Sequence, residues 1–216
     1  MLEIKDVKFS YGKNCILNNV NLQILPGTCT GIIGRNGCGK STLLSVITGI
    51  RKPDTGTIIK ASPDIKIGYI PQDNPLMPDL SGYDNMLLWY EGSKKQFENE
   101  LKSPLIDKLG INKFIKKPVK ALSGGMKKKI SIAMTLISHP DIVVLDEPSA
   151  ALDIPTKTEI DNYLAQYISD NHSIIITTHD EAELNICTDL YAIQNNTLVK
   201  CDKNVRGEAL LNILCG

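Results

Sequence analysis

The sequence predicts an α/β fold built around a parallel sheet. An apolar segment (30–33), a glycine-rich segment (34–39) and an apolar helix-forming segment follow one another as strand, loop and helix. The continuous apolar run 142–145 is typical of a strand buried on both faces of a parallel sheet. It ends in the acidic pair Asp146-Glu147, at the edge where such sheets hold their ligands.

The elements before the glycine-rich segment are expected to be antiparallel strands. Segments 2–9 and 20–24 alternate apolar and polar residues, and Pro26-Gly27 then turns the chain. After the helix, Pro53-Asp54-Thr55-Gly56 predicts a turn, and 65–70 predicts another strand that ends at Pro71-Gln72.

A helical lobe is predicted between two parts of the core. Helix-rich sequence runs from about Leu80 to Lys117, with breaks at Gly92, Pro104 and Gly110. A helix that opens at 122–126 completes the lobe, and Pro140 stops it. We therefore expect residues 1–216 to form a single domain, in which 1–72 and 140–216 make the core with its antiparallel subdomain and 73–139 make the lobe.

The C-terminal part continues the α/β pattern. A helix with Ile160, Leu164 and Tyr167 on one side leads to a strand at 173–178, which ends at His179. A hairpin around Asn195-Asn196 and an amphipathic helix from Glu208 to Leu214 are expected after it.

The glycine-rich segment carries the most specific chemistry. Gly34 to Thr42 fits the pattern G-x-x-x-x-G-K-[ST] between a strand and a helix, where a chance glycine turn is the less favoured interpretation. Inward-facing backbone amides and the helix N-terminus would cradle a polyphosphate. Lys40 would reach the β- and γ-phosphates of a nucleotide, and the Ser41 hydroxyl would bind Mg²⁺.

Polar residues at strand ends predict hydrolysis of that nucleotide. Asp146 is expected to hold Mg²⁺, and Glu147 to orient and deprotonate the attacking water. His179 is placed to contact the γ-phosphate, and Gln72 to sense Mg²⁺ and the water. Taken singly, His179 and Gln72 are weak signals, because a lone strand-end histidine is more often structural.

Two residues near the glycine-rich segment add hypotheses. Tyr11 at the end of the first strand would stack on an adenine ring, although an ordinary strand-end tyrosine is equally consistent with the sequence. Cys38 lies beside Lys40 in a positively polarised loop, so we expect a lowered thiol pKa and raised reactivity toward maleimide.

Composition limits the class of protein. The chain has 216 residues, of which 42% are hydrophobic and 22% charged, as in soluble globular proteins. Its longest apolar runs are too short to span a bilayer, and the first residues lack the apolar core of a signal peptide, so a cytosolic protein is expected. The six cysteines show neither zinc-site nor disulfide spacing.

Charge is unevenly distributed along a chain of zero net charge. Residues 94–129 contain eleven lysines and only three acidic residues. Such a lobe can face anionic lipid or nucleic acid, but a solvated lysine-rich surface is the favoured interpretation, and no nucleic acid partner is expected.

These motifs together resemble the nucleotide-binding subunit of ABC transporters over nearly the whole chain. Gly34–Thr42 matches Walker A, Ile142–Asp146 matches Walker B, and Gln72 matches the Q-loop. Leu122–Met126 resembles the signature LSGGQ, 149–153 resembles the D-loop, and His179 resembles the switch histidine. The resemblance implies a RecA-like P-loop NTPase core with an antiparallel β subdomain and an inserted helical lobe, the ABC ATPase fold.

The resemblance also implies a set of functional residues. Catalytic roles fall to Glu147, His179 and Gln72, and Mg²⁺ ligands are Ser41, Asp146 and Gln72. The ATP-binding residues are Tyr11, Gly34, Asn36, Gly37, Cys38, Gly39, Lys40, Ser41, Thr42, Ser123, Gly124, Gly125 and Asp153.

The resemblance further implies a dimer, a homodimer or a heterodimer with a second ABC ATPase subunit, that sandwiches two ATP molecules head to tail. Each signature loop would bind the γ-phosphate held by the other subunit. A separate transmembrane permease would dock against the lobe near residues 73–92, which would make the chain a cytoplasmic protein, peripheral on the inner face of the cell membrane.

Two departures from the family pattern stand out. Met126 replaces the signature glutamine, and Ala133-Met134-Thr135-Leu136 lacks the usual arginine. We expect a modest effect of the first, because the serine and both glycines remain. A lysine after a signature methionine is more similar to bacterial export systems than to importers.

Two other classes of function remain open from the sequence. A soluble ABC ATPase that acts in assembly or remodelling would have no membrane partner. A nucleotide or small-molecule kinase would share the phosphate loop, but it would leave residues 122–126 unexplained.

Overall fold

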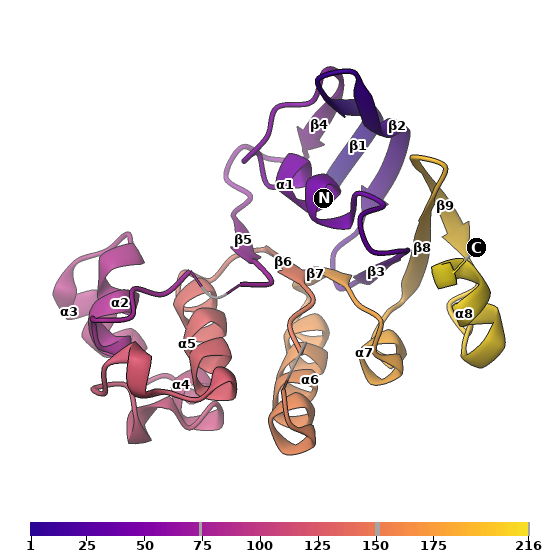
Figure 1. Ribbon diagram of the computed structural model, residues 1–216. Helices are drawn as coiled ribbons and strands as arrows, with labels where there is room; N and C mark the ends of the chain where they lie inside the picture. Colours follow the sequence, from indigo (N-terminus) through magenta and orange to yellow (C-terminus); the bar gives the residue numbers. More distant parts are fainter. Residues whose placement is uncertain (74, 150–151, 216) are drawn as a thin grey trace.

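The computed structural model describes residues 1–73, 75–149 and 152–215, and it has the predicted α/β architecture (Figure 1). A six-stranded sheet crosses the middle of the molecule. A three-stranded antiparallel sheet lies above it in the view of Figure 1, and a group of helices stands to the left.

The central sheet is parallel except at one edge. Its order is β5 (Ile67–Ile70), β6 (Ile142–Asp146), β7 (Ser173–Thr177), β3 (Cys29–Ile33), β8 (Asp189–Gln194) and β9 (Thr197–Cys201). Only β9 is antiparallel, and it joins β8 through Asn195 and Asn196, whose φ angles are 47° and 65°. Asparagine tolerates this left-handed backbone, so the predicted hairpin is confirmed.

The side chains of the apolar run in β6 pack into two hydrophobic clusters, one on each face of the sheet. Ile142 and Val144 pack into the cluster formed with the antiparallel sheet, and Val143 and Leu145 pack into the cluster formed with the helices. All four side chains are fully buried, which contributes about 1.5–3 kcal/mol each. This two-sided burial explains why the segment has no polar alternation.

The antiparallel sheet has the order β2 (Asn14–Ile24), β1 (Leu2–Tyr11), β4 (Thr55–Lys60). The alternating pattern predicted β1 and β2. It did not predict β4, which begins inside the expected turn at 53–56. Gly56 has a φ of 86°, and a Cβ there would lie 2.5 Å from the carbonyl oxygen of Asp6, so only glycine permits the pairing.

Helices surround the sheets, and the predicted breaks separate those of the lobe. Gly92 lies between α2 and α3, Pro104 begins α4, and Gly110 caps η1. The helices are α1 (Lys40–Ile47), α2 (Gly82–Trp89), α3 (Lys94–Glu100), α4 (Pro104–Lys108), η1 (Ile111–Lys113), η2 (Val119–Ala121), α5 (Gly124–Leu136), α6 (Ile154–Ser169), α7 (Glu181–Asn185) and α8 (Gly207–Cys215).

Side-chain caps begin the two helices that follow the predicted signature and D-loop. The Ser123 hydroxyl accepts a hydrogen bond from the Met126 amide at 3.3 Å and caps α5. The Asp153 carboxylate accepts one from the Thr156 amide at 2.8 Å and caps α6. Each cap fixes the position of the chain where it enters its helix.

Candidate active site

The glycine-rich loop lies between β3 and α1, as the sequence predicts. Gly37 and Gly39 have φ angles of 79° and 110°, and a Cβ on Gly39 would lie 2.7 Å from the Cγ2 atom of Ile16. No side chain caps the start of α1, so its first amides stay available to an anion. The loop therefore leaves backbone amides open at the start of α1, as the predicted phosphate cradle requires.

A cavity of about 380 Å³ brings most of the predicted nucleotide-binding residues together. Gly34 and Cys38 belong to the loop but do not line this cavity. The lining residues are Tyr11, Ile16, Asn36, Gly37, Gly39, Lys40, Ser41, Thr42, Gln72 and Glu147.

Lys40 places a buried positive charge beside the loop. Its side chain is 6% exposed, and its amine donates to the carbonyl oxygens of Gly34 at 2.9 Å and Arg35 at 3.4 Å. The Glu147 Oε1 atom lies 3.8 Å from the same amine. A charge held at low exposure interacts strongly with a phosphate, because little water screens it.

Glu147 forms backbone hydrogen bonds to the end of β7, and its carboxylate contacts two other predicted catalytic residues. Its backbone amide donates to the carbonyl oxygen and the hydroxyl of Thr177, both at 3.1 Å. Gln72 Nε2 donates to its Oε2 atom at 3.2 Å, and His179 Nε2 lies 3.3 Å from its Oε1 atom. The three residues come from the ends of β5, β6 and β7, which are neighbours in the sheet.

The backbone of Glu147 is strained. Its φ is 46°, in the left-handed region, which costs a residue with a side chain roughly 1–2 kcal/mol. The two hydrogen bonds to Thr177 maintain this conformation. The sharp turn after β6 aims the carboxylate along the sheet edge toward Gln72 and His179.

Asp146 is a buried carboxylate, 3% exposed, whose Oδ1 atom accepts a hydrogen bond from the Thr177 hydroxyl at 2.6 Å. Thr177 thus orients both acidic residues, a role that the sequence analysis did not assign. Its only sequence signal is its place at the end of the apolar strand 173–177.

Burial and a nearby positive charge lower the pKa of His179. Burial and the nearby Lys40 ammonium lower its pKa below the usual value for histidine, although Glu147 opposes them. The imidazole is therefore neutral at pH 7. A neutral ring supplies one donor and one acceptor nitrogen to the site.

A second cavity of about 320 Å³ is lined by Glu147, which also lines the first cavity, and by His179. Glu183 in α7 lines it and is 1% exposed, and burial raises its pKa to about 7. Its Oε1 atom has no hydrogen-bond partner among the described residues. The sequence analysis did not identify Glu183, because α7 is too short to show a clear apolar face.

Tyr11 lines the first cavity, of about 380 Å³, from the end of β1 and is 46% exposed. Its ring packs edge to face on Phe9, with 5.0 Å between centroids, and the Arg51 guanidinium lies 5.0 Å from its centroid. These contacts hold an aromatic surface beside the loop.

The predicted signature residues lie outside the cavity of their own chain. Ser123, Gly124 and Gly125 are at the start of α5, and Asp153 is the cap of α6. Ala150 and Ala151 of the predicted D-loop lie outside the described residues. A single chain therefore does not bring the signature to the phosphate loop.

The expected lowering of the Cys38 pKa is wrong. Burial raises the pKa of its thiol, and the lowering effects of Lys40 and of backbone hydrogen bonds are smaller. Its side chain is half-buried against the apolar cluster around α1 and β1 rather than facing the cavity. Desolvation of the thiolate therefore outweighs the positive polarity of the loop.

Comparison with known proteins identifies the family. The family model for ABC transporters matches residues 17–150. The chain is 36% identical over 195 residues to the lantibiotic transport ATP-binding protein SrtF of Streptococcus pyogenes, covering 88% of this chain and 84% of that protein. It is 32% identical over 206 residues to the Nod factor export ATP-binding protein I of Paraburkholderia xenovorans, covering 89% and 67%.

Solved structures similar to this chain belong to the same family as these relatives. The ATP-binding cassette MJ0796, in a dimeric post-hydrolysis state bound to ADP and Pi, is 26% identical with a TM-score of 0.82, covering 96% of this chain and 100% of that chain. The ABC ATPase fold is thereby confirmed. The chain belongs to the ABC transporter family, as one of its ATP-binding, ATP-hydrolysing subunits.

Proposed function

We propose that the chain powers transport by a separate membrane-spanning partner and works as a dimer with ATP between the subunits. The observation that carries this proposal is an apolar groove beside the segment that leads into Gln72. Pro71, the residue before Gln72, lines the groove, so that a protein bound there can influence hydrolysis through the backbone of Gln72.

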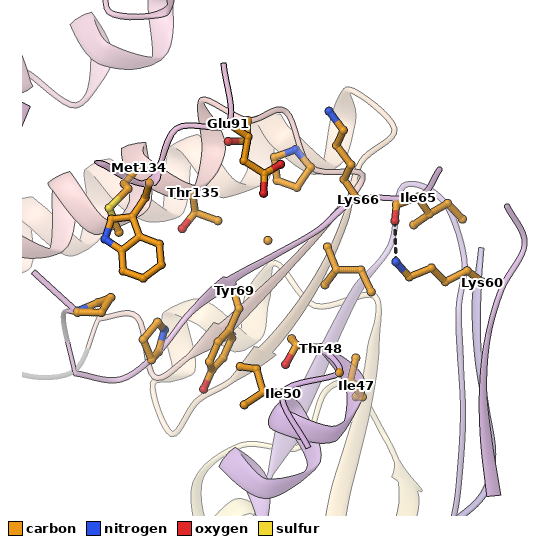
Figure 2. A pocket seen from close by; sticks show the side chains of 18 of the residues that line it. Ile47, Thr48, Ile50, Lys60, Ile65, Lys66, Tyr69, Glu91, Met134 and Thr135 are labelled. Carbon is orange, nitrogen blue, oxygen red and sulfur yellow. Dashed lines mark hydrogen bonds between the residues drawn. The ribbon is translucent and has the colours of Figure 1, made fainter. Parts of the chain in front are cut away.

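The groove has a volume of about 1090 Å³ and lies between the core and the helical lobe. Figure 2 shows Tyr69 and Ile50 from the core, and Met134 and Thr135 from α5, around it. Ile50 and Trp89 are 63% and 57% exposed, an unusual exposure for such large apolar side chains. These features support docking of a helix from the membrane partner, with an apolar face toward Trp89 and Ile50.

In the proposed reaction, the loop amides and Lys40 bind the β- and γ-phosphates of ATP. Glu147 orients and deprotonates the water that attacks the γ-phosphorus in line with the leaving group. Gln72 and His179 hold the Glu147 carboxylate at its two oxygens, and the neutral His179 ring also contacts the γ-phosphate. Tyr11 stacks on the adenine ring.

The residues present fit a magnesium ion. Ser41 lines the cavity, and Asp146 offers a carboxylate oriented by Thr177. No group of three or more histidine, cysteine, aspartate or glutamate side chains within the described residues is arranged to hold a metal ion. Ser41, Asp146 and Gln72 would hold it, and it would neutralise charge on the phosphates.

A second subunit completes the site. Ser123, Gly124 and Gly125 stand at the N-terminus of a thirteen-residue helix and outside the cavity of their own chain. In a head-to-tail dimer, this helix N-terminus meets the γ-phosphate bound by the other subunit, with Asp153 at the same interface. The dimeric state of the similar cassette MJ0796 supports this arrangement.

The proposed partner determines where the chain is located in the cell and in which direction transport runs. Among the described residues, no helix combines the length and apolar character that a bilayer crossing needs. We infer a cytoplasmic protein bound to the inner face of the cell membrane. The Nod factor relative is named for export, and this supports the export direction that Met126-Lys127 suggests.

The test is recovery of tagged protein from native membranes in gentle detergent, followed by mass spectrometry. We expect a stoichiometric multispanning protein with the wild-type chain. Trp89→Asp should lose it, and Leu25→Asp should retain it, because Leu25 is 50% exposed but lies outside the groove. Recovery only from the soluble fraction, or equal recovery with both variants, would contradict the proposal and favour an assembly factor.

A further inference from the structure

A buried lysine in α5 joins the signature helix to the backbone around Gln72. Lys128 is 3% exposed, and its amine donates to the carbonyl oxygens of Pro71 at 3.2 Å and Gln72 at 3.0 Å. These two carbonyls close β5 and begin the loop that carries the Gln72 side chain. Hydrogen bonds from a charged amine are stronger than those between neutral groups.

The neighbouring lysines show that this contact is particular to one position. Lys127 is partly exposed, and Lys129 forms an ion pair with Glu159 of α6. Lys128 lies on the buried face of α5 with Ser131 and Ile132. An apolar side chain would fill that face without the desolvation cost of an amine, so packing alone does not account for the lysine.

Carboxyl groups from three different segments act on the charge of the amine. Burial lowers the pKa of the Lys128 amine below its usual value, and Asp146 at the end of β6, Asp73 in the loop after Gln72 and Glu183 in α7 oppose that shift. These carboxylates offset only part of the effect of burial, and the hydrogen bonds of the amine go to backbone oxygens.

We propose that Lys128 is a positioning residue for hydrolysis, which fastens the Pro71–Gln72 backbone to the signature helix and so presents the Gln72 side chain to Glu147. The Gln72 Nε2 atom donates to Glu147 Oε2 at 3.2 Å, so a shift of the backbone by one ångström breaks that bond. Lys128 itself touches neither the phosphate loop nor Glu147.

The position of Lys128 has a mechanical consequence. Helix α5 begins at Ser123, which caps its first turn, and Pro71 lines the groove beside Tyr69. One amine thus ties together the signature helix, the groove wall and the catalytic glutamine. Displacement of any one of them is transmitted to the other two through the two hydrogen bonds.

The test is a double-mutant cycle on the purified full chain, measured as steady-state hydrolysis of Mg-ATP. Lys128→Met should lower kcat about tenfold and leave KM and the affinity for a fluorescent ATP analogue within about twofold, because the phosphate loop is untouched. Lys128→Arg should restore most of kcat. The matched control Lys127→Met should have the kcat and KM of the wild-type chain.

The cycle separates positioning from a general structural effect. In a Gln72→Ala background, Lys128→Met should cause no further loss, since the side chain it positions is gone. An unchanged kcat in Lys128→Met, or the same tenfold loss in both backgrounds, would overturn the proposal. If Lys128→Met does not fold, as judged by circular dichroism, Lys128→Gln replaces it, and kcat is compared in the same two backgrounds with the same criteria.

Discussion

At the scale of single residues, burial decides which ionisable groups take part in chemistry. Lys40, Asp146 and Glu147 have low exposure and partners at short distances, whereas the sequence gives only their types and order. Cys38 shows the limit of arguing from sequence neighbours. Its proximity to Lys40 predicted a lowered pKa, but the fold partly buries the side chain and raises the pKa instead.

We predict that maleimide modifies Cys38 more slowly at pH 7 than it modifies free cysteine. The raised pKa leaves less of the reactive thiolate at that pH, and the rate should climb as pH rises toward 9. Mass spectrometry of timed reactions, with Cys38→Ser to assign the site, measures this. A rate above that of free cysteine would restore the sequence-based hypothesis.

We predict that Glu183→Gln stabilises the protein at pH 8 and not at pH 5. The native pKa of Glu183 is about 7, against 4.5 for an ordinary glutamate, so the folded chain holds a proton that the unfolded chain releases between these values. The free energy of unfolding therefore falls as pH rises from 4.5 to 7, by about 3 kcal/mol in total.

The measurement is urea unfolding of wild type and variant at both pH values. The exposed neighbour Glu181 provides the control, because Glu181→Gln removes a charge from the same helix without relieving burial. Identical midpoints for wild type and Glu183→Gln at pH 8 would show that the native pKa of Glu183 is not raised by burial.

At the scale of elements, the start of α5 combines a cap with the predicted signature. Ser123 caps the helix by accepting a hydrogen bond from the Met126 backbone amide, and the same residue is the one that we propose contacts a phosphate of the other subunit. The side chain of Met126 packs partly against the helical core, so it contributes to packing rather than to the cap.

We predict that Met126→Gln changes ATPase activity by less than about tenfold, because the backbone cap and the helix N-terminus are unaltered. Steady-state hydrolysis at saturating Mg-ATP measures this, and thermal unfolding controls for loss of the packing contact. A rise of tenfold or more would mean that the glutamine side chain supplies a contact that this chain lacks.

At the scale of the whole molecule, the candidate site is divided between two surfaces. The phosphate loop, Glu147 and His179 gather at one sheet edge, and the signature lies at the end of a lobe that stands apart from it (Figure 1). A monomer thus presents two half-sites, and the proposed dimer joins the half-sites of opposite subunits.

We predict that Glu147→Gln forms a stable dimer in saturating Mg-ATP. The amide keeps the hydrogen-bonding shape but cannot accept the proton of the attacking water, so hydrolysis falls by a factor of about 100 or more and ATP stays between the subunits. Size-exclusion chromatography with light scattering detects the dimer, and ADP provides the control. A monomer at saturating Mg-ATP would refute the sandwich arrangement.

The sequence alone determined the central architecture and the composition of the site. The apolar run ending at Asp146, the alternating segments before residue 24 and the glycine loop each follow from local physics: burial on two faces, burial on one face and backbone freedom at glycine. The order and spacing of the motifs predicted which residues belong to the candidate site, because the predicted chemistry depends on residue type and spacing.

Only the tertiary structure decided features that depend on contacts between distant segments. Strand β4 is mostly exposed and shows no alternation, so its pairing with β1 has no local signal. The role of Thr177, the burial of Glu183 and the inward amine of Lys128 arise where separate strands and helices meet. Burial and hydrogen-bond partners, rather than residue type, set the charge and the position of such groups.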